Sequence, residues 1–156
     1  MGTPRTQART DPLTGLLNRS AIRAFAEREL LRVRREGGPA TLAVFDIEGL
    51  KAVNDTGGHL GGDALLRRFA AGISASLRPG DGAARYGGDE FLLLLPDTDV
   101  AGAELVMEGL GERDGRWSAG VAERRDGEDF ESWFERADAP LYRATSARRA
   151  ARSHPA

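Results

Sequence analysis

The chain has 156 residues, of which 40% are apolar and 29% charged, with a net charge of −2 and no cysteine. A chain of this length forms one domain with a substantial core, and the lack of cysteine excludes disulfides, thiolate metal sites and a cysteine nucleophile. The near-neutral charge gives no reason to expect binding to nucleic acid or anionic lipid. No apolar run approaches the roughly 20 residues of a membrane segment, and residues 1–10 lack a signal-peptide core, so we expect a soluble cytoplasmic protein.

The first half of the chain predicts a helix, a buried strand and two further helices. Apolar residues recur at helical spacing over 21–36, in a helix that Asn18 or Ser20 would cap. The short apolar run 41–45 is typical of a buried strand, and it places Asp46 at the C-terminal end of that strand. The next expected elements are a short helix over 49–55, a break at Thr56-Gly57-Gly58 and a helix over 60–77.

The second half predicts a hairpin followed by mixed structure. The turn would be Gly87-Gly88-Asp89-Glu90-Phe91, which lies between Arg85-Tyr86 and the apolar run 92–95, so its flanks are expected to pair as two strands. A helix over 100–110, a strand over 117–122 and a helical pattern over 130–149 follow. Strands that alternate with helices predict an α/β domain.

Acidic residues collect at the predicted strand ends. Asp46 ends one strand and Asp89-Glu90 stand at the hairpin, so these carboxylates meet if the strands are neighbours. Clustered carboxylates repel one another unless a cation neutralises them, and Mg²⁺ combines a few carboxylates with substrate phosphates. Gly87 and Gly88 can adopt positive φ and let a ligand approach bare backbone. The pattern favours metal-assisted phosphoryl or nucleotidyl transfer; the alternative is that these acids are ordinary turn residues.

An ordered series of motifs resembles the GGDEF family of diguanylate cyclases, which condense two GTP molecules into cyclic di-GMP. The resemblance runs over about residues 11–149 and implies a GGDEF domain over 11–150, with short tails at 1–10 and 151–156. It implies an α/β (α+β) fold of the nucleotide-cyclase, palm-like kind, with a central mostly antiparallel sheet flanked by helices. The matching segments are 11–18 (D-x-L-T-G-L-x-N), 45–63 (Phe45-Asp46-Ile47 to Gly62-Asp63), 85–91, Ser118-Ala119-Gly120, and Ala137-Asp138 with Leu141-Tyr142.

The resemblance implies a catalytic metal centre at the hairpin. Mg²⁺ or Mn²⁺ would be held by Asp46, the Ile47 carbonyl and Asp89. Glu90 would be a further ligand, or the base that acts on the 3′-hydroxyl of the substrate. Gly87-Gly88 would lie against that substrate.

The resemblance also implies residues that bind GTP. Asn54 and Asp63 would read the guanine edge, and Lys51 and Arg149 would contact the triphosphate. From the residues alone, Asn54 and Asp63 are equally read as helix or turn caps. Lys51 is otherwise a solvated helix residue, although it is the one lysine in the chain.

The segment Arg78-Pro79-Gly80-Asp81 resembles the R-x-x-D inhibitory site of the family, where cyclic di-GMP binds away from the active site. The Arg78 guanidinium can stack on guanine and grip phosphate, with Asp81 completing the motif. The alternative is an ordinary Pro-Gly turn between a helix and a strand.

Some residues depart from the family pattern, and the reaction implies two subunits. Thr145 stands where a phosphate-binding lysine is usual, and Pro140 interrupts a helical pattern at a cost of about 3 kcal/mol. These departures favour the rival hypothesis of a catalytically silent GGDEF module that binds GTP or cyclic di-GMP and regulates a partner; a different cyclic dinucleotide product is a third. Catalysis would need a homodimer, yet only ten residues precede Asp11, so we expect a fragment or an unusual mode of dimerisation.

Overall fold

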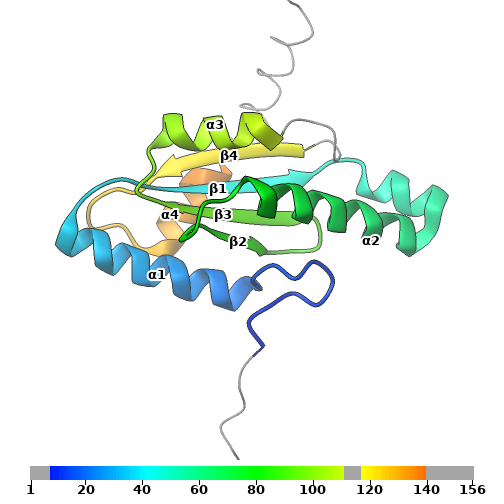
Figure 1. The fold of residues 1–156 in the computed structure, drawn as a ribbon, viewed down its shortest axis with the longest axis horizontal. Helices are drawn as coiled ribbons and strands as arrows, with labels where there is room; N and C mark the ends of the chain where they lie inside the picture. The colour runs from blue at the N-terminus through cyan, green and yellow to red at the C-terminus, as the bar shows by residue number, and fades with distance from the viewer. Residues whose placement is uncertain (1–7, 111–116, 140–156) are drawn as a thin grey trace, which may run out of the picture.

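A computed structural model describes residues 8–110 and 117–139 of the chain. Its centre is a four-stranded sheet in the order β2-β3-β1-β4, in which every neighbouring pair is antiparallel, with helices around it (Figure 1). The predicted fold class is therefore confirmed. The elements are α1 (Arg19–Glu36), β1 (Ala40–Ile47), α2 (Leu50–Ser76), β2 (Gly82–Arg85), β3 (Glu90–Pro96), α3 (Val100–Leu110), β4 (Trp117–Glu123) and α4 (Phe130–Asp138).

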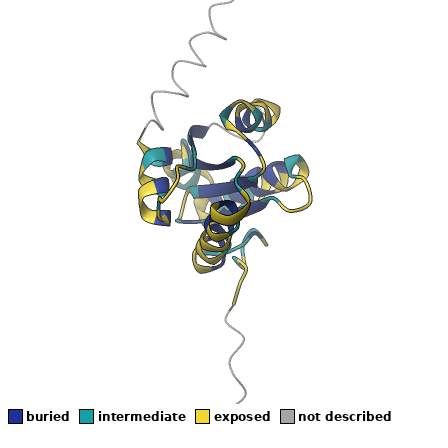
Figure 2. Cartoon of the chain, turned by 90° about the vertical axis from the view of Figure 1, so that its left-hand side faces the viewer, coloured by how far each residue is buried: buried dark blue, intermediate teal, exposed yellow. Residues whose placement is uncertain are grey.

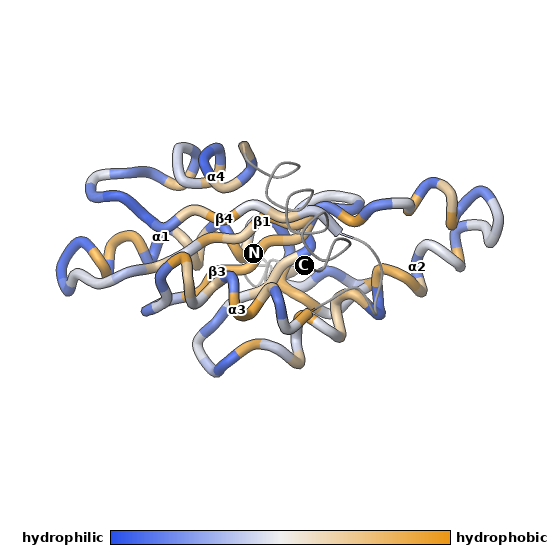
Figure 3. The backbone as a smooth tube through the Cα atoms, turned by 90° about the horizontal axis from the view of Figure 1, so that it is seen from above, coloured by the Kyte–Doolittle hydropathy of each residue, from blue (hydrophilic) through white to orange (hydrophobic). Residues whose placement is uncertain are grey.

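Helices cover both faces of the sheet. Seen from above, α4 and α3 lie on opposite sides of the strands (Figure 3). Side chains alternate along a strand, so Leu42 and Val44 of β1 pack with α1 and α4, whereas Phe45 and Ile47 pack with α2 and α3. By the same alternation Asp46 belongs to the α1–α4 face. The strands are the buried centre of the domain, and the helices expose their outer sides (Figure 2).

The first helix begins and ends where local chemistry requires. The Asn18 side chain accepts a hydrogen bond from the Ala21 N–H at 3.0 Å, which makes Asn18 the N-cap; Ser20 instead donates to Asn18. The helix ends at Gly37. Strand β1 ends at Ile47, so Asp46 is its penultimate residue, at the C-terminal end of the strand as predicted.

The predicted break between two helices is confirmed inside α2. Gly58 has φ 69° and ψ −172°, a backbone conformation that glycine alone adopts without strain. Gly58 thus makes a kink between two helical limbs that follow each other directly and together span Leu50 to Ser76. The break redirects the chain between Asn54 on the first limb and Asp63 on the second.

The last described helix, α4, is fixed by its ends and by one tryptophan. The Asp129 side chain accepts from the Ser132 N–H at 2.9 Å, and Trp133 Nε1 donates to the Ala122 carbonyl at 2.7 Å. The predicted helical pattern over 130–149 is thus confirmed as far as Asp138, and its remainder lies outside the described residues. No helix in the described ranges combines the length and apolarity that a bilayer crossing requires.

Candidate functional site

The signature segment forms the turn between β2 and β3, as predicted. The N–H groups of Tyr86 and Gly87 both donate to the Glu90 carbonyl, at 2.7 and 3.2 Å. Arg85 closes the tip by donating Nε and Nη2 to the Gly88 carbonyl, at 3.2 and 2.9 Å. The expected use of positive φ is wrong, since neither Gly87 nor Gly88 lies in the left-handed region. The turn is closed by Arg85 and not by special glycine conformations.

The N-terminal motif braces this hairpin. Asp11 Oδ2 accepts from the N–H and the hydroxyl of Thr14, at 2.9 and 2.8 Å, and Asp11 Oδ1 lies 3.4 Å from Arg85 Nη1. The backbone of Leu17 bonds to Ala83 and Arg85 of β2, each at 3.0 Å. The motif therefore holds the same arginine that holds the hairpin tip.

The predicted metal ligands come together at the open end of β1 and β3. Asp46 and Glu90 are directly opposed across the two strands, and directly opposed side chains share one face of a sheet. The Ile47 N–H donates to the Asp89 carbonyl at 2.9 Å, which continues the pairing into the turn. Strand pairing alone thus places Asp46, Ile47, Asp89 and Glu90 next to one another at one end of the two central strands.

Negative charge accumulates there in a partly desolvated position. Burial raises the pKa of Asp46 to about 6, and the charge of Asp89, a hydrogen bond with its carboxyl and the nearby Asp138 and Glu48 add to the effect. Burial also raises the pKa of Glu90, followed by the charges of Asp138 and Asp46. Such a group of carboxyls needs a proton or a cation to be stable.

Three further residues at this site were not assigned a role from the sequence. Asp138 arrives from the end of α4, and Arg19 opens α1 with its guanidinium 4.3 Å from the centre of the Tyr86 ring. Ser118 of β4 donates to Glu48 at 2.5 Å, which fixes the carboxylate that follows β1. Asp138 belongs to a motif shared with the family, so the sequence could have pointed to it. No sequence motif marks Arg19, because only the packing of α1 beside the hairpin brings it to the site.

The donor set fits a divalent cation only in part. Within residues 8–110 and 117–139, no three His, Cys, Asp or Glu side chains converge closely enough to form a complete metal site. The charge of Asp89 contributes to the raised pKa of Asp46, and a cation such as Mg²⁺ would relieve that repulsion. The Ile47 carbonyl is a third oxygen, and Mg²⁺ usually completes its shell with water and substrate phosphates.

The two predicted guanine-reading residues meet across the break in α2. The Asn54 amide lies against Gly62, so closely that a Cβ on Gly62 would stand 1.9 Å from Asn54 Oδ1. This oxygen is buried and accepts no hydrogen bond from the described part of the chain. Asp63 follows Gly62 directly. Asn54 and Asp63 both lie inside the helical limbs of α2, in which Gly58 is the residue with non-helical φ and ψ, so neither of them occupies a cap position.

Of the two residues predicted to contact the triphosphate, the structure describes Lys51 only. Lys51 is exposed in the first turn of α2, and it forms no hydrogen bond or ion pair with another described residue. Its ammonium is therefore available to a phosphate. Arg149 lies outside the described residues, as do Pro140 and Thr145.

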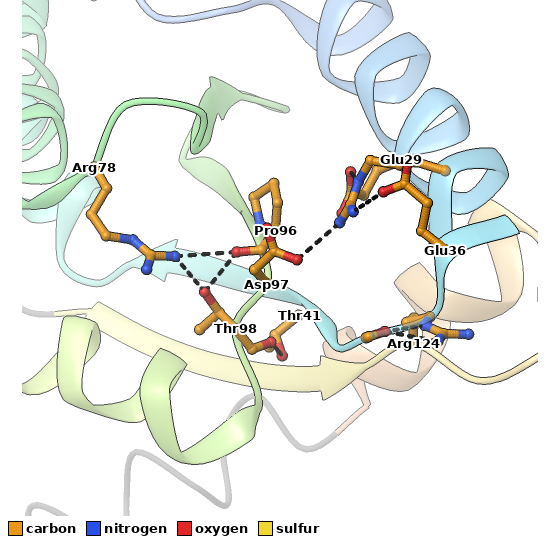
Figure 4. A network of polar contacts seen from close by, with 10 residues as sticks. Glu29, Glu36, Thr41, Arg78, Pro96, Asp97, Thr98 and Arg124 are labelled. Atoms are coloured by element: carbon orange, nitrogen blue, oxygen red, sulfur yellow. Dashed lines mark hydrogen bonds and ion pairs between the residues drawn. The ribbon is translucent and has the colours of Figure 1, made fainter. Parts of the chain in front are cut away.

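The predicted inhibitory residues form a compact turn next to β3. Asp81 Oδ2 accepts from the Arg78 N–H at 2.9 Å and lies 3.5 Å from Arg78 Nε. Arg78 Nη2 donates to the Pro96 carbonyl at 3.1 Å and to Thr98 Oγ1 at 2.6 Å (Figure 4). Arg78, Asp81 and Thr98 are among the residues that line a hollow of about 320 Å³. The structure therefore contains the Pro-Gly turn, and Arg78 beside it is bonded to the loop after β3 and paired with Asp81.

Comparisons with known proteins agree with this architecture. The family model described as diguanylate cyclase, GGDEF domain, matches residues 8–113. The chain is 42% identical over 158 aligned positions to diguanylate cyclase DgcP of Pseudomonas aeruginosa, covering 93% of this chain and 24% of DgcP. The GGDEF domain of DgcB from Caulobacter crescentus, solved in complex with c-di-GMP, superposes with a TM-score of 0.83 at 35% identity, covering 93% of this chain and 94% of that one.

A second solved structure extends the likeness. Diguanylate cyclase SiaD, in complex with its activator SiaC from Pseudomonas aeruginosa, gives a TM-score of 0.80 at 36% identity, covering 92% of this chain and 59% of SiaD. The chain spans about a quarter of DgcP, so the likeness is to one domain of that protein. The family match, the identity over nearly the whole chain and the shared fold agree: the chain belongs to the GGDEF domain family of diguanylate cyclases.

Proposed function

We propose that this domain is a diguanylate cyclase that condenses two GTP molecules into cyclic di-GMP with release of two pyrophosphates. The observation that carries the proposal is the pairing of β1 with β3, which sets Asp46 directly opposite Glu90 and joins the Ile47 N–H to the Asp89 carbonyl at 2.9 Å. Two carboxyls held together in a partly desolvated position repel each other when ionised, which costs stability. A domain that bound no cation would gain from losing one of them.

The metal would be Mg²⁺ or Mn²⁺, held by Asp46, Asp89 and the Ile47 carbonyl. When bound, it would stabilise the charge that develops at the attacked phosphate and on the leaving pyrophosphate. Glu90 is the candidate base toward the 3′-hydroxyl. Its pKa is raised toward neutral pH, and a general base works best when its pKa lies near the working pH. Lys51 would contribute a positive charge at the phosphates.

Guanine would be read by the pair at the α2 break. The Asp63 carboxylate accepts hydrogen bonds, which suits the N1–H and N2–H donors of guanine. The buried Asn54 Oδ1 lacks a donor within the described residues, and a buried acceptor without a partner is costly until a donor arrives. A Cβ at Gly88 would meet no atom within 4 Å, so the space beside the turn is open to substrate.

The reaction needs two copies of the domain. Each copy would present one GTP, and each 3′-hydroxyl would attack the α-phosphate of the other GTP. The 3′-oxygen forms the new phosphodiester bond, its proton passes to the base, and pyrophosphate leaves. We therefore propose a working homodimer, located in the cytoplasm where GTP is available, with cyclic di-GMP returning to Arg78 and Asp81 as an inhibitor.

A silent GGDEF module that binds GTP or cyclic di-GMP is the second candidate. The observation that favours it is Thr145 in place of the usual phosphate-binding lysine, together with Pro140 nearby. Such a protein would keep the guanine pair and the Arg78 turn while failing to turn over. A different cyclic dinucleotide product would follow if Asn54 and Asp63 tolerated a second base.

One assay separates these candidates. The chain is incubated with GTP and Mg²⁺ or Mn²⁺, and the nucleotides are resolved by chromatography. We expect cyclic di-GMP from the natural sequence and a loss of at least about 100-fold in Asp89→Ala, which removes one carboxylate from the metal. The matched control is Asp126→Ala, since the Asp126 side chain is 96% exposed and pairs only with Arg124 among the described residues. Equal product from Asp89→Ala and Asp126→Ala would refute the metal assignment.

A further inference from the structure

Thr98 makes a contact that the predicted inhibitory motif does not include. It belongs to the loop between β3 and α3, and its hydroxyl accepts a hydrogen bond from Arg78 Nη2 at 2.6 Å while donating to the Pro96 carbonyl at 2.9 Å (Figure 4). Arg78 Nη2 also donates to the Pro96 carbonyl at 3.1 Å. Both hydrogens of Nη2 are thus committed to one short segment of loop.

The loop that presents Thr98 is held from two sides. Thr41 of β1 donates its hydroxyl to the Thr98 carbonyl at 2.7 Å in a buried position. Asp97 has φ 53°, and it is the one residue other than glycine with positive φ in the described ranges. Its carboxylate lies 3.3 Å from Arg32 of α1, which adds a second contact between this loop and the rest of the domain. The Thr98 hydroxyl is therefore presented by a fixed loop.

The opposite side of the Arg78 guanidinium is fixed as well. Its Nε lies 3.5 Å from Asp81 Oδ2, and the Asp81 side chain is only 3% exposed whereas that of Arg78 is 61% exposed. Asp81 therefore anchors the base of the turn while the guanidinium reaches into solvent. Within the described residues, Nη1 donates to no acceptor, which leaves one edge of the guanidinium and its faces available to a ligand.

We propose that Thr98 is a positioning residue for the binding of cyclic di-GMP at Arg78; this rests on the inhibitory role proposed for Arg78 and Asp81. Thr98 accepts a hydrogen bond from Nη2, and Asp81 forms an ion pair with Nε. These contacts orient the guanidinium at the hollow that Arg78, Asp81 and Thr98 line. A free arginine side chain loses much rotamer freedom when it grips a phosphate. A side chain that is already oriented loses less, so the ligand binds more tightly.

The carboxylates near the hollow each have a partner of their own. Asp97 is paired with Arg32, and Asp99 accepts a hydrogen bond from the Gly102 N–H at 2.9 Å at the start of α3. Asp81 is engaged by the backbone and the side chain of Arg78. Among the charged side chains that the structure describes at this hollow, the Arg78 guanidinium is the one that offers hydrogen-bond donors to a ligand.

The test is the affinity of the full chain for cyclic di-GMP, measured by calorimetry for four proteins. Thr98→Val keeps the shape and removes the hydroxyl, and we expect about tenfold weaker binding, the size of one hydrogen bond to a charged group. Thr98→Ser restores the hydroxyl and is expected to bind within about twofold of the natural chain. Thermal melting establishes that the variants are folded, and Thr98→Ala replaces Thr98→Val if that protein is not.

The fourth protein, Arg78→Ala, separates two kinds of failure. If the natural chain and Arg78→Ala bind cyclic di-GMP equally, or neither binds, the inhibitory site is wrong and the role of Thr98 falls with it. If Arg78→Ala loses binding while Thr98→Val matches the natural chain, only the role of Thr98 is refuted. Tighter binding by Thr98→Val would also refute it, because Thr98 would then hold Arg78 away from the ligand.

Discussion

At the scale of residues, the site is built from groups that are unfavourable without a ligand. Asp46 lies opposite Glu90 and near the charge of Asp89, and Asn54 buries an oxygen without a donor in the described chain. Each arrangement lowers stability by itself, and each would be relieved by a different part of the proposed ligand, a metal in the first case and a purine in the second. That shared logic supports a metal–nucleotide site better than either feature alone.

The raised pKa of Asp46 predicts how metal binding depends on pH. Its ordinary pKa is 3.8 and its pKa in the fold is about 6. Below about pH 6 the Asp46 carboxyl therefore holds a proton that a bound cation would have to displace. We expect the affinity for Mn²⁺ to fall by about tenfold per unit as the pH drops below about 6 and to level off above it. Calorimetry between pH 5 and 8 measures this, and an affinity independent of pH would contradict it.

The same proton sets the sign of a stability effect. Between the unfolded value of 3.8 and the folded value of about 6, the metal-free native state binds more protons than the unfolded chain. Its free energy of unfolding therefore decreases as the pH rises through that window. This contribution to stability is fully present below about pH 3.8 and is lost above about pH 6. With saturating Mn²⁺ we expect the free energy of unfolding to stop decreasing as the pH rises through this window.

Gly62 predicts a mutation that damages base recognition without touching the metal. A Cβ there would stand 1.9 Å from Asn54 Oδ1, so Gly62→Ala must displace the Asn54 amide. We expect KM for GTP to rise about tenfold or more, the cost of an unpaired polar contact, with Mn²⁺ affinity unchanged. Gly109→Ala is the control, because a Cβ there would meet nothing within 4 Å. An unaltered KM in Gly62→Ala would exclude Asn54 from guanine recognition.

At the scale of elements, the sequence predicted most of the architecture because the decisive signals were local. Asn18, the break at Gly58 and the hairpin at residues 86–89 follow from capping, glycine conformation and strand pattern. The sequence could not predict that Arg85 closes the turn in place of positive φ at Gly87 and Gly88. It also could not place Arg19 or Thr98, since both reach their partners only through the packing of distant elements.

The brace between the N-terminal motif and the hairpin gives a prediction at this scale. Asp11 holds Thr14 and Arg85 in a half-buried position, and Arg85 holds the hairpin tip. We expect Asp11→Ala to lower the free energy of unfolding by about 1–3 kcal/mol, the cost of losing hydrogen bonds to a charged group, and to lower turnover as well. Urea unfolding compared with Asp126→Ala measures the first effect. A stability equal to that of Asp126→Ala would show that the brace contributes nothing.

At the scale of the whole molecule, the two proposed sites lie at opposite ends of the central strands. Its end at Asp46 and Glu90 carries the proposed chemistry, and the far end of β1 and β3 carries the Thr41–Thr98–Arg78 contacts. Strand β1 spans both, so the two sites are joined by the most buried element of the fold. Pro140, Thr145 and Arg149 lie outside the described residues, and the geometry of the triphosphate contacts therefore remains a prediction from sequence.

The proposed activity requires that this domain turns over GTP as a pair of copies. The most direct test measures pyrophosphate and cyclic di-GMP in the same reaction over a range of protein concentrations. We predict two pyrophosphates for each cyclic di-GMP, with a specific activity that rises with protein concentration because two copies must meet. Binding of GTP without pyrophosphate release at any concentration would contradict the claim and identify the domain as a silent module.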